Sequence, residues 1–209
     1  MENLIIKYFL YTIVIILTGA IITVAFSYFL SKDQFIEYKG LIQLISLSSG
    51  LIFILLMSNS HSLLWNFYKK SNINSNQIYL LLLFFIFSMV LEYLINDDIY
   101  RGRKITVIRA LQTFLVIPVL EELVFRGVFQ NRLTQSYGWK LGILITSILF
   151  MLIHYGQLDQ MILSVIFSFL SGYLFHRTNS LLLCVVFHVL VNIGIFMLGN
   201  FCHTLINLF

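Results

Sequence analysis

Repeated apolar runs constrain this chain more than any other feature. Five or more of these runs are near 20 residues long, which is enough to cross a hydrocarbon core of about 30 Å as a helix. Only 11% of the residues are charged, against roughly 25% in soluble domains, so a water-soluble globule is excluded. The sequence predicts an all-α, polytopic helical bundle in the membrane, with about seven transmembrane helices. The expected spans are Tyr8 to Leu30, Leu41 to Trp65, Ile78 to Ile95, Ile105 to Leu133, Leu141 to Ile153, Met161 to Phe175 and Leu181 to Leu198.

The short polar linkers between these runs indicate one integrated membrane domain. Residues 1–104 hold three expected spans, and residues 105–209 hold four in a core that carries most of the intramembrane ionisable groups. The first run is too long for a cleavable signal and is expected to remain as a helix. The tail from Asn200 to Phe209 is too short to cross and is expected to lie in the interface or against the bundle. The expected location is the cell membrane, with several passes.

Charge excludes one class of partner. The net charge is +4, and the basic residues stand singly or in small groups between apolar runs, where lipid headgroups would meet them. Nucleic acid is therefore not an expected partner, and the lipid bilayer is. Two cysteines form no disulfide framework.

Ionisable and strongly polar residues gather in the last four spans. Insertion of such a group costs at least about 2.5 to 3.5 kcal/mol at membrane depth, so each is a candidate for function. Glu92 and Arg109 lie near span ends, where snorkelling or an interface position explains them. The residues expected at depth are Glu121, Glu122, Arg126, His154, His188 and Asn192.

Depth arithmetic predicts that four of these side chains meet. Alternating helix directions put the turn after the fourth span on the same side as the turn after the sixth. At 1.5 Å per residue from that side, Glu121 lies at roughly 18 Å, His154 at roughly 21 Å, His188 at roughly 12 Å and Asn192 at roughly 18 Å. These polar groups should therefore converge near the middle of the bilayer.

Two features of helix geometry bear on this region. Pro118, the only proline, is expected to kink the fourth helix and to free a backbone carbonyl one turn earlier, which would help to open a cavity. Ser168 and Gly172 stand at i and i+4, and are read as a packing surface for a neighbouring helix.

The two adjacent carboxylates are expected to differ in role. Glu121 and Glu122 point about 100° apart on a helix, so one can pair while the other reacts. Arg126 stands at i+4 from Glu122, the spacing of an intrahelical ion pair. Glu121 is then left facing the cavity, where it could take a proton from water.

The side chains expected opposite Glu121 supply the other groups that peptide hydrolysis needs. His154 could orient the water or shuttle its proton. His188 and Asn192 share a helical face and could donate hydrogen bonds to an oxyanion on the peptide carbonyl. Spacing alone leaves another interpretation open, in which the same set locks the bundle together or forms a proton or ion path.

Three motifs resemble those of a known family. Residues 121–127 read Glu-Glu-Leu-Val-Phe-Arg-Gly and resemble the EExxxR signature, often continued as EExxFRG. Residues 150–154 match FxxxH and residues 188–192 match HxxxN. In this order the motifs resemble those of the CPBP intramembrane proteases, which include CAAX-processing enzymes and bacteriocin-immunity proteins. The resemblance covers about residues 105–198 and says little of the first hundred.

The resemblance implies a role for each motif residue. Glu121 would be the base that activates water, and His154 its partner. His188 and Asn192 would form the oxyanion site. Glu122 and Arg126 carry over as supporting members.

Two other chemistries use the same side chains. Glu121, His154 and His188 are one carboxylate and two imidazoles, a familiar zinc set, although no HExxH is present and the three ligands would come from three helices. Cys184, His188 and Asn192 stand at successive i+4 steps and superficially suggest a cysteine nucleophile. A cysteine in the middle of a membrane is usually a small apolar filler. No metal or other cofactor is expected, with zinc as the alternative.

The leading hypothesis is therefore an intramembrane endopeptidase that depends on a glutamate. Its expected substrate is a membrane-inserted or lipid-associated peptide or protein, such as a bacteriocin or signalling-peptide precursor or a CAAX-type protein. The alternative is a non-catalytic immunity or regulatory protein that binds a peptide or a membrane partner.

Overall fold

A computed structural model describes residues 4–31, 42, 45, 49, 52, 74–95, 107–155 and 158–206. These residues form helices and connecting turns, with no strand among them. The helices are α1 (Leu4–Phe29), α4 (Ser75–Ile95), α5 (Val107–Leu111), η2 (Gln112–Val116), α6 (Ile117–Glu122), η3 (Leu123–Gln130), α7 (Asn131–Tyr137), α8 (Trp139–Ile153), α9 (Leu158–Thr178) and α10 (Leu181–Ile206).

The all-helical fold is confirmed for the described residues, but the count of seven spans is not. Within the described ranges, four helices are long and apolar enough to cross a membrane, namely α1, α4, α9 and α10. The apolar helix α8 is shorter, at 15 residues. The expected span from Leu41 to Trp65 lies outside the described residues, apart from four isolated positions. These four positions are helical: Ile42, Ile45, Ser49 and Ile52.

The expected fourth span is a helical run whose hydrogen bonding changes along its length. From Val107 to Tyr137 the chain passes through α5, η2, α6, η3 and α7, where η2 and η3 are π-helical. Such segments are rare and often mark functional sites. Pro118 stands near the start of α6, immediately after the first π segment. The predicted disturbance at the proline is therefore a change of helix type, and Glu121 and Glu122 close the α-helical piece between the two π segments.

The helices pack around two clusters of buried side chains. The first joins α1, η3 and α8 through Tyr8, Phe125, Phe129 and Phe150, and the second joins α4, α9 and α10. Phe167 of α9 packs against both. Because lipid tails are as apolar as these side chains, close packing rather than transfer out of water holds the clusters together.

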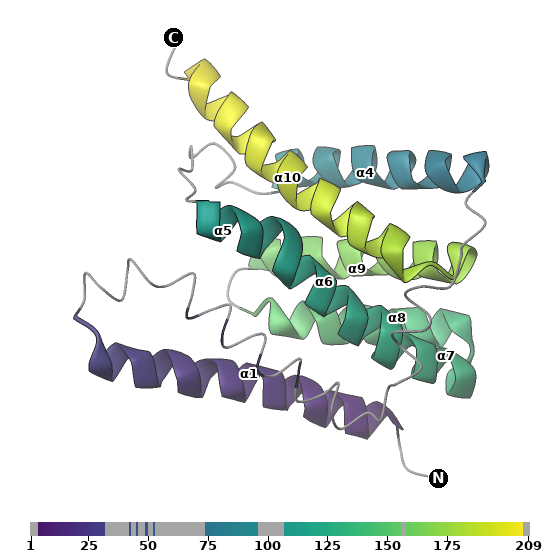
Figure 1. Ribbon diagram of the computed structural model, residues 1–209. Coiled ribbons are helices and arrows are strands. Elements are labelled where there is room, and N and C mark those ends of the chain that lie inside the picture. The colour runs from purple at the N-terminus through teal and green to yellow at the C-terminus, as the bar shows by residue number, and fades with distance from the viewer. Residues whose placement is uncertain are drawn as a thin grey trace.

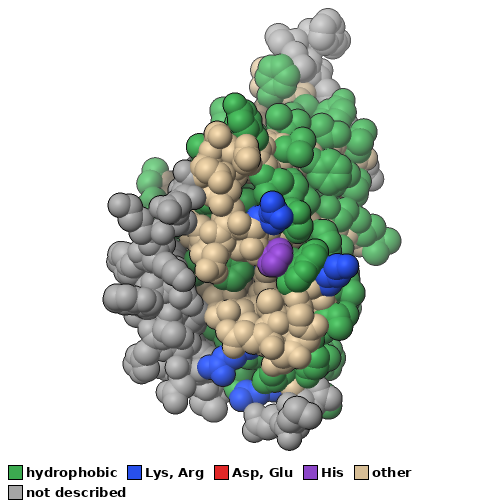
Figure 2. Space-filling view, turned by 90° about the vertical axis from the view of Figure 1, so that its right-hand side faces the viewer, with side chains coloured by type: hydrophobic (Ala, Val, Ile, Leu, Met, Phe, Trp, Pro, Cys, Tyr) green, Lys and Arg blue, Asp and Glu red, His purple; other side chains and the backbone are tan. Residues whose placement is uncertain are grey.

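Figure 1 shows the axes of α1, α4, α8 and α9 lying roughly parallel or antiparallel to one another, with α10 crossing them obliquely. Gly138 alone separates α7 from α8, and its φ of 82° favours glycine. Asn179, with φ 50°, ends α9 before α10 begins. The end of the bundle with these turns is shown in Figure 2, where Lys and Arg lie among hydrophobic side chains and no Asp or Glu of the described residues is visible. This is the composition expected where lipid headgroups meet a bundle.

One expected boundary is wrong. The helix from Leu181 does not stop at Leu198, because α10 continues to Ile206 through the start of the expected tail. Polar side chains in this stretch bond to the carbonyl four residues earlier: Asn200 Nδ2 donates to Phe196 O at 3.0 Å, and Thr204 Oγ1 donates to Asn200 O at 2.9 Å. These polar side chains are thus satisfied within the helix, which continues past them.

Candidate active site

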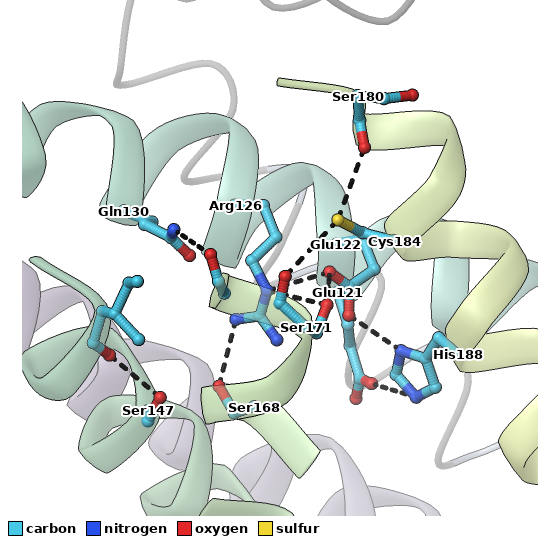
Figure 3. A network of polar contacts seen from close by, with 12 residues as sticks. Glu121, Glu122, Arg126, Gln130, Ser147, Ser168, Ser171, Ser180, Cys184 and His188 are labelled. Atoms are coloured by element: carbon cyan, nitrogen blue, oxygen red, sulfur yellow. Dashed lines mark hydrogen bonds and ion pairs between the residues drawn. The ribbon is translucent and has the colours of Figure 1, made fainter. Parts of the chain in front are cut away.

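The predicted ion pair within the EExxxR motif is present and fully buried. Arg126 Nε lies 3.0 Å from Glu122 Oε2, and neither side chain is exposed. Two hydroxyls of α9 complete the contact, since Arg126 donates to Ser168 Oγ at 3.0 Å and to Ser171 Oγ at 3.2 Å (Figure 3). The guanidinium also lies 5.5 Å from the centre of the Phe150 ring. This network joins η3, α8 and α9 around a buried charge.

The role of Ser168 differs from the sequence interpretation. Ser168 and Gly172 do lie against the helix of the motif, where the carbonyl of Gly172 accepts a hydrogen bond of 2.7 Å from Gln130 Nε2. Ser168 and Ser171 in addition solvate the arginine, and Ser171 donates to Glu122 Oε2 at 3.0 Å. The signal that could have shown this was polarity at helical spacing on α9, because Ser164, Ser168 and Ser171 are all buried.

His188 connects the two adjacent carboxylates. Its Nδ1 lies 3.1 Å from Glu122 Oε1, and its Nε2 lies 3.6 Å from Glu121 Oε2. The two carboxylates were expected to point apart and act separately, but both contact the same imidazole, as Figure 3 shows. An imidazole can do this because its two nitrogens face different directions. Since Glu122 is also paired with Arg126, its oxygen is an acceptor, and His188 Nδ1 is assigned as the donor.

His154 lies at the end of α8 with one nitrogen fixed. Its Nδ1 is 3.0 Å from the carbonyl oxygen of Phe150, one turn earlier. A carbonyl can only accept, so Nδ1 carries the hydrogen and Nε2 is left as an acceptor. The ring also packs on Phe150, at 4.6 Å between centroids. The FxxxH motif therefore determines both the position and the tautomer of this histidine.

Asn192 is attached to the helix that contains the proline. Its Nδ2 donates a hydrogen bond of 2.9 Å to the backbone oxygen of Thr113, in η2. In the same π segment Ile117 N–H bonds to Gln112 O, so the matching donor for Thr113 O would be the backbone nitrogen of Pro118, which has no hydrogen. The carbonyl that Pro118 was expected to release is thus the one that Asn192 binds. The second hydrogen of the amide remains for another acceptor.

Two cavities meet at His154. One, of ≈ 200 Å³, is lined by His154, His188 and Asn192 together with side chains of α4 and α9. The other, of ≈ 410 Å³, lies between α1 and the motif helix, and is lined by Glu121 and His154 among others. The structure therefore brings the four predicted side chains together, with Glu121 and His188 in contact and His154 on both cavities.

The position of Glu92 differs from expectation. It is 8% exposed and lines the first cavity, so it does not snorkel toward an interface. The reason is that α4 packs against α9 and α10, and this face of α4 meets the cavity instead of lipid. The side chain of Arg109 lies outside the described residues.

The metal alternative needs three close ligands. In the ranges that the structure covers, no three His, Cys, Asp or Glu side chains lie close enough together to hold a metal ion. Glu121 and His188 are neighbours, but the preformed zinc set of Glu121, His154 and His188 is not assembled.

Cys184 lies with the packing residues of α10. Its side chain is fully buried in the second cluster, with Sγ 3.4 Å from Ser180 O and 3.6 Å from Ser171 O. We expect Cys184→Ala to keep most of the activity of the unmodified protein, because a thiol that contacts carbonyl oxygens is not activated as a nucleophile. Turnover of the two purified proteins is the measurement. Loss of turnover in a normally folded variant, together with labelling of Cys184 by a thiol-directed inhibitor, would contradict this.

Comparison with known proteins gives one match. Residues 103–194 match the family model described as type II CAAX prenyl endopeptidase Rce1-like. Comparisons with curated proteins and with solved structures gave no match. The matched segment contains all three motifs and ends two residues after Asn192. The Rce1-like family is a protease family, which supports peptidase activity for this membrane protein. Residues 103–194 therefore match the CPBP/CAAX protease family, the family that the three motifs resemble.

Proposed function

We propose that this chain is an intramembrane endopeptidase in which Glu121 activates the attacking water. The observation that carries the proposal is the contact of His188 with both carboxylates of the motif, beside two cavities. Glu122 is already engaged by Arg126 and Ser171, whereas Glu121 lines a cavity. Of the two carboxylates, Glu121 is thus the one that water can reach.

The proposed reaction moves one proton through Glu121. Water attacks the carbonyl carbon of the scissile peptide bond while Glu121 takes a proton from it. His154 Nε2, an acceptor at the junction of the cavities, orients the other water hydrogen. The carbonyl oxygen becomes an oxyanion, and Glu121 then gives its proton to the amide nitrogen as the C–N bond breaks. The products are a carboxylic acid and an amine.

His188 and Asn192 are proposed to stabilise the oxyanion. Glu122 accepts a hydrogen bond from Nδ1–H of His188, and His188 acts in this scheme as an imidazolium, whose Nε2–H is the donor to the oxyanion. Asn192 keeps one amide hydrogen after its bond to Thr113, and donors fixed in this way need no reorganisation during the reaction. Arg126 and Glu122 do not touch substrate in this scheme. They position His188.

The proposed substrate is a membrane-inserted or lipid-associated peptide or protein. A CAAX-type protein, a bacteriocin precursor and a signalling-peptide precursor all have a segment that could lie in such a cavity. The test is to express the unmodified protein and Glu121→Gln in the native host, and to compare the small-peptide and membrane proteomes by mass spectrometry. We expect one or more full-length proteins to accumulate, and their fragments to disappear, in the variant. Identical proteomes would contradict the proposal.

The proposed mechanism is complete without a metal. We expect purified protein to keep its activity after exhaustive chelation and to contain well under one zinc per chain, as measured by elemental analysis. Stoichiometric zinc whose removal stops turnover would instead favour Glu121, His154 and His188 as ligands that close around the ion.

A further inference from the structure

The side chain of Glu92, on α4, forms part of the wall of the first cavity. Glu92 is 8% exposed and lines the cavity that also contains His154, His188 and Asn192. A substrate in contact with the proposed catalytic side chains would therefore lie next to this carboxylate.

The same face of α4 carries an unsatisfied hydroxyl. Ser88 precedes Glu92 by four residues, so the two side chains share a helical face, and both line the cavity. Ser88 is 9% exposed, and its Oγ has no hydrogen-bond partner among the residues that the structure describes. An unsatisfied buried hydroxyl at a cavity indicates a group that binds there.

Close packing holds this wall against the helix of the HxxxN motif. A Cβ placed on Gly194 of α10 would lie 2.5 Å from Met89 Sδ and 3.1 Å from Phe85 Cε2, both on α4. Gly194 follows Asn192 by two residues. The Ser88–Glu92 face is thus at a fixed distance from the proposed oxyanion site. It also lies outside the matched segment 103–194.

We propose that Ser88 and Glu92 form a subsite that binds a positively charged nitrogen of the substrate. A carboxylate and a hydroxyl can both accept hydrogen bonds, and a cationic N–H group gives the strongest ones. The nitrogen belongs to a Lys or Arg side chain, or to a free α-amino group. Apolar side chains, including Phe167 and Val191, also line the cavity and suit the apolar flank of a membrane peptide. This inference names the substrate chemistry of the proposed protease and rests on that proposed function.

Binding and cleavage are measured separately, so that the two proposals can fail separately. The probes are synthetic Leu/Ala peptides of about 20 residues, acetylated at the amino terminus, with one Lys, norleucine or Glu moved along the sequence. Affinity is measured in proteoliposomes with the full-length Glu121→Gln protein, which needs no turnover. At one position the Lys peptide should bind about tenfold more tightly than the norleucine peptide. A peptide with a free amino terminus and no Lys is the arm for an α-amino group.

Variants of α4 assign the preference to the subsite. In the Glu121→Gln background, Glu92→Gln should remove the preference for Lys, and Glu92→Lys should make the Glu peptide the tighter ligand. A purely structural role for Glu92 would not reverse the preference. Ser88→Ala keeps the carboxylate and should weaken Lys binding about threefold. Asp159→Asn, which removes a carboxylate that lines neither cavity, is the control and should leave the preference unchanged.

The subsite would be contradicted if neither the Lys peptides nor the free-amino peptide bound more tightly than the acetylated norleucine peptides. Cleavage of the same peptides by the unmodified protein addresses the proposed function. Cleavage without any charge preference would overturn the subsite alone, whereas a Glu92-dependent preference in binding without cleavage would overturn the protease alone.

Discussion

Glu121→Gln should lower the rate of peptide cleavage by at least about 10²-fold, the lower range for general-base catalysis, while the protein stays folded. Glutamine keeps the size and hydrogen-bonding capacity of the side chain but cannot take a proton from water. Glu121 contacts His188 across 3.6 Å, and Arg126 keeps Glu122 as its counter-charge when Glu121 is changed. Turnover in proteoliposomes and the midpoint of thermal unfolding are the two measurements.

The control for this prediction is Asp159→Asn, which makes the same chemical change in the first turn of α9. Its rate should match that of the unmodified protein. If Glu121→Gln folds normally and leaves a host phenotype such as immunity to a peptide unaffected, the catalytic explanation of that phenotype is wrong. The binding scaffold would then be the better account.

Glu122→Gln should lower stability as well as activity, because it leaves Arg126 without its counter-charge. Both side chains are fully buried, so the free energy of unfolding should fall by about 3 to 5 kcal/mol. The variant also loses the carboxylate that accepts from His188 Nδ1, so activity should fall together with stability. Protein level in the membrane and thermal unfolding in detergent are the measurements.

A double variant separates charge from packing. Glu122→Gln combined with Arg126→Met removes both charges, and should recover part of the stability that the single variant loses. Activity should remain low, because His188 would still lack its carboxylate partner. Lys140→Met removes a cation from an exposed position and should change stability by less than about 0.5 kcal/mol. A double variant no more stable than Glu122→Gln would show that the ion pair is not the source of the loss.

The sequence was sufficient for the features that depend on local spacing. Length and hydropathy predict the long helices, and the i, i+4 spacing predicts the pair of Glu122 and Arg126. Counting residues along each helix also places Glu121 and His188 within roughly 6 Å of each other in depth, and the two are in contact. Each of these steps uses only the rise and turn of a helix.

Features that depend on which helix is the neighbour could not be predicted from one sequence. Ser168 and Ser171 look like packing residues until the position of Arg126 is known, because a serine suits both a close helix contact and a buried cation. Glu92 was misjudged for the same reason. Its distance from the end of the span suggested an interface, but the burial of that face of α4 follows from its contacts with α9 and α10.

Hydropathy alone also could not predict the number of spans. The run from Val107 to Tyr137 contains glutamates, an arginine and a proline. Its backbone alternates between α and π hydrogen bonding. Hydropathy measures the composition of a segment and not the register of its backbone. The division at residue 104 between an N-terminal part and a core remains a prediction.

The bond from Asn192 to Thr113 makes two distant positions interdependent. With any residue other than proline at position 118, the backbone would regain an N–H, and Thr113 could find its partner within its own helix. The amide of Asn192 would then be free to rotate, and its remaining hydrogen would lose its fixed direction. The choice of side chain at 118 therefore limits what position 192 can do, although the two residues belong to different helices. Any redesign of one position has to treat the other as its complement.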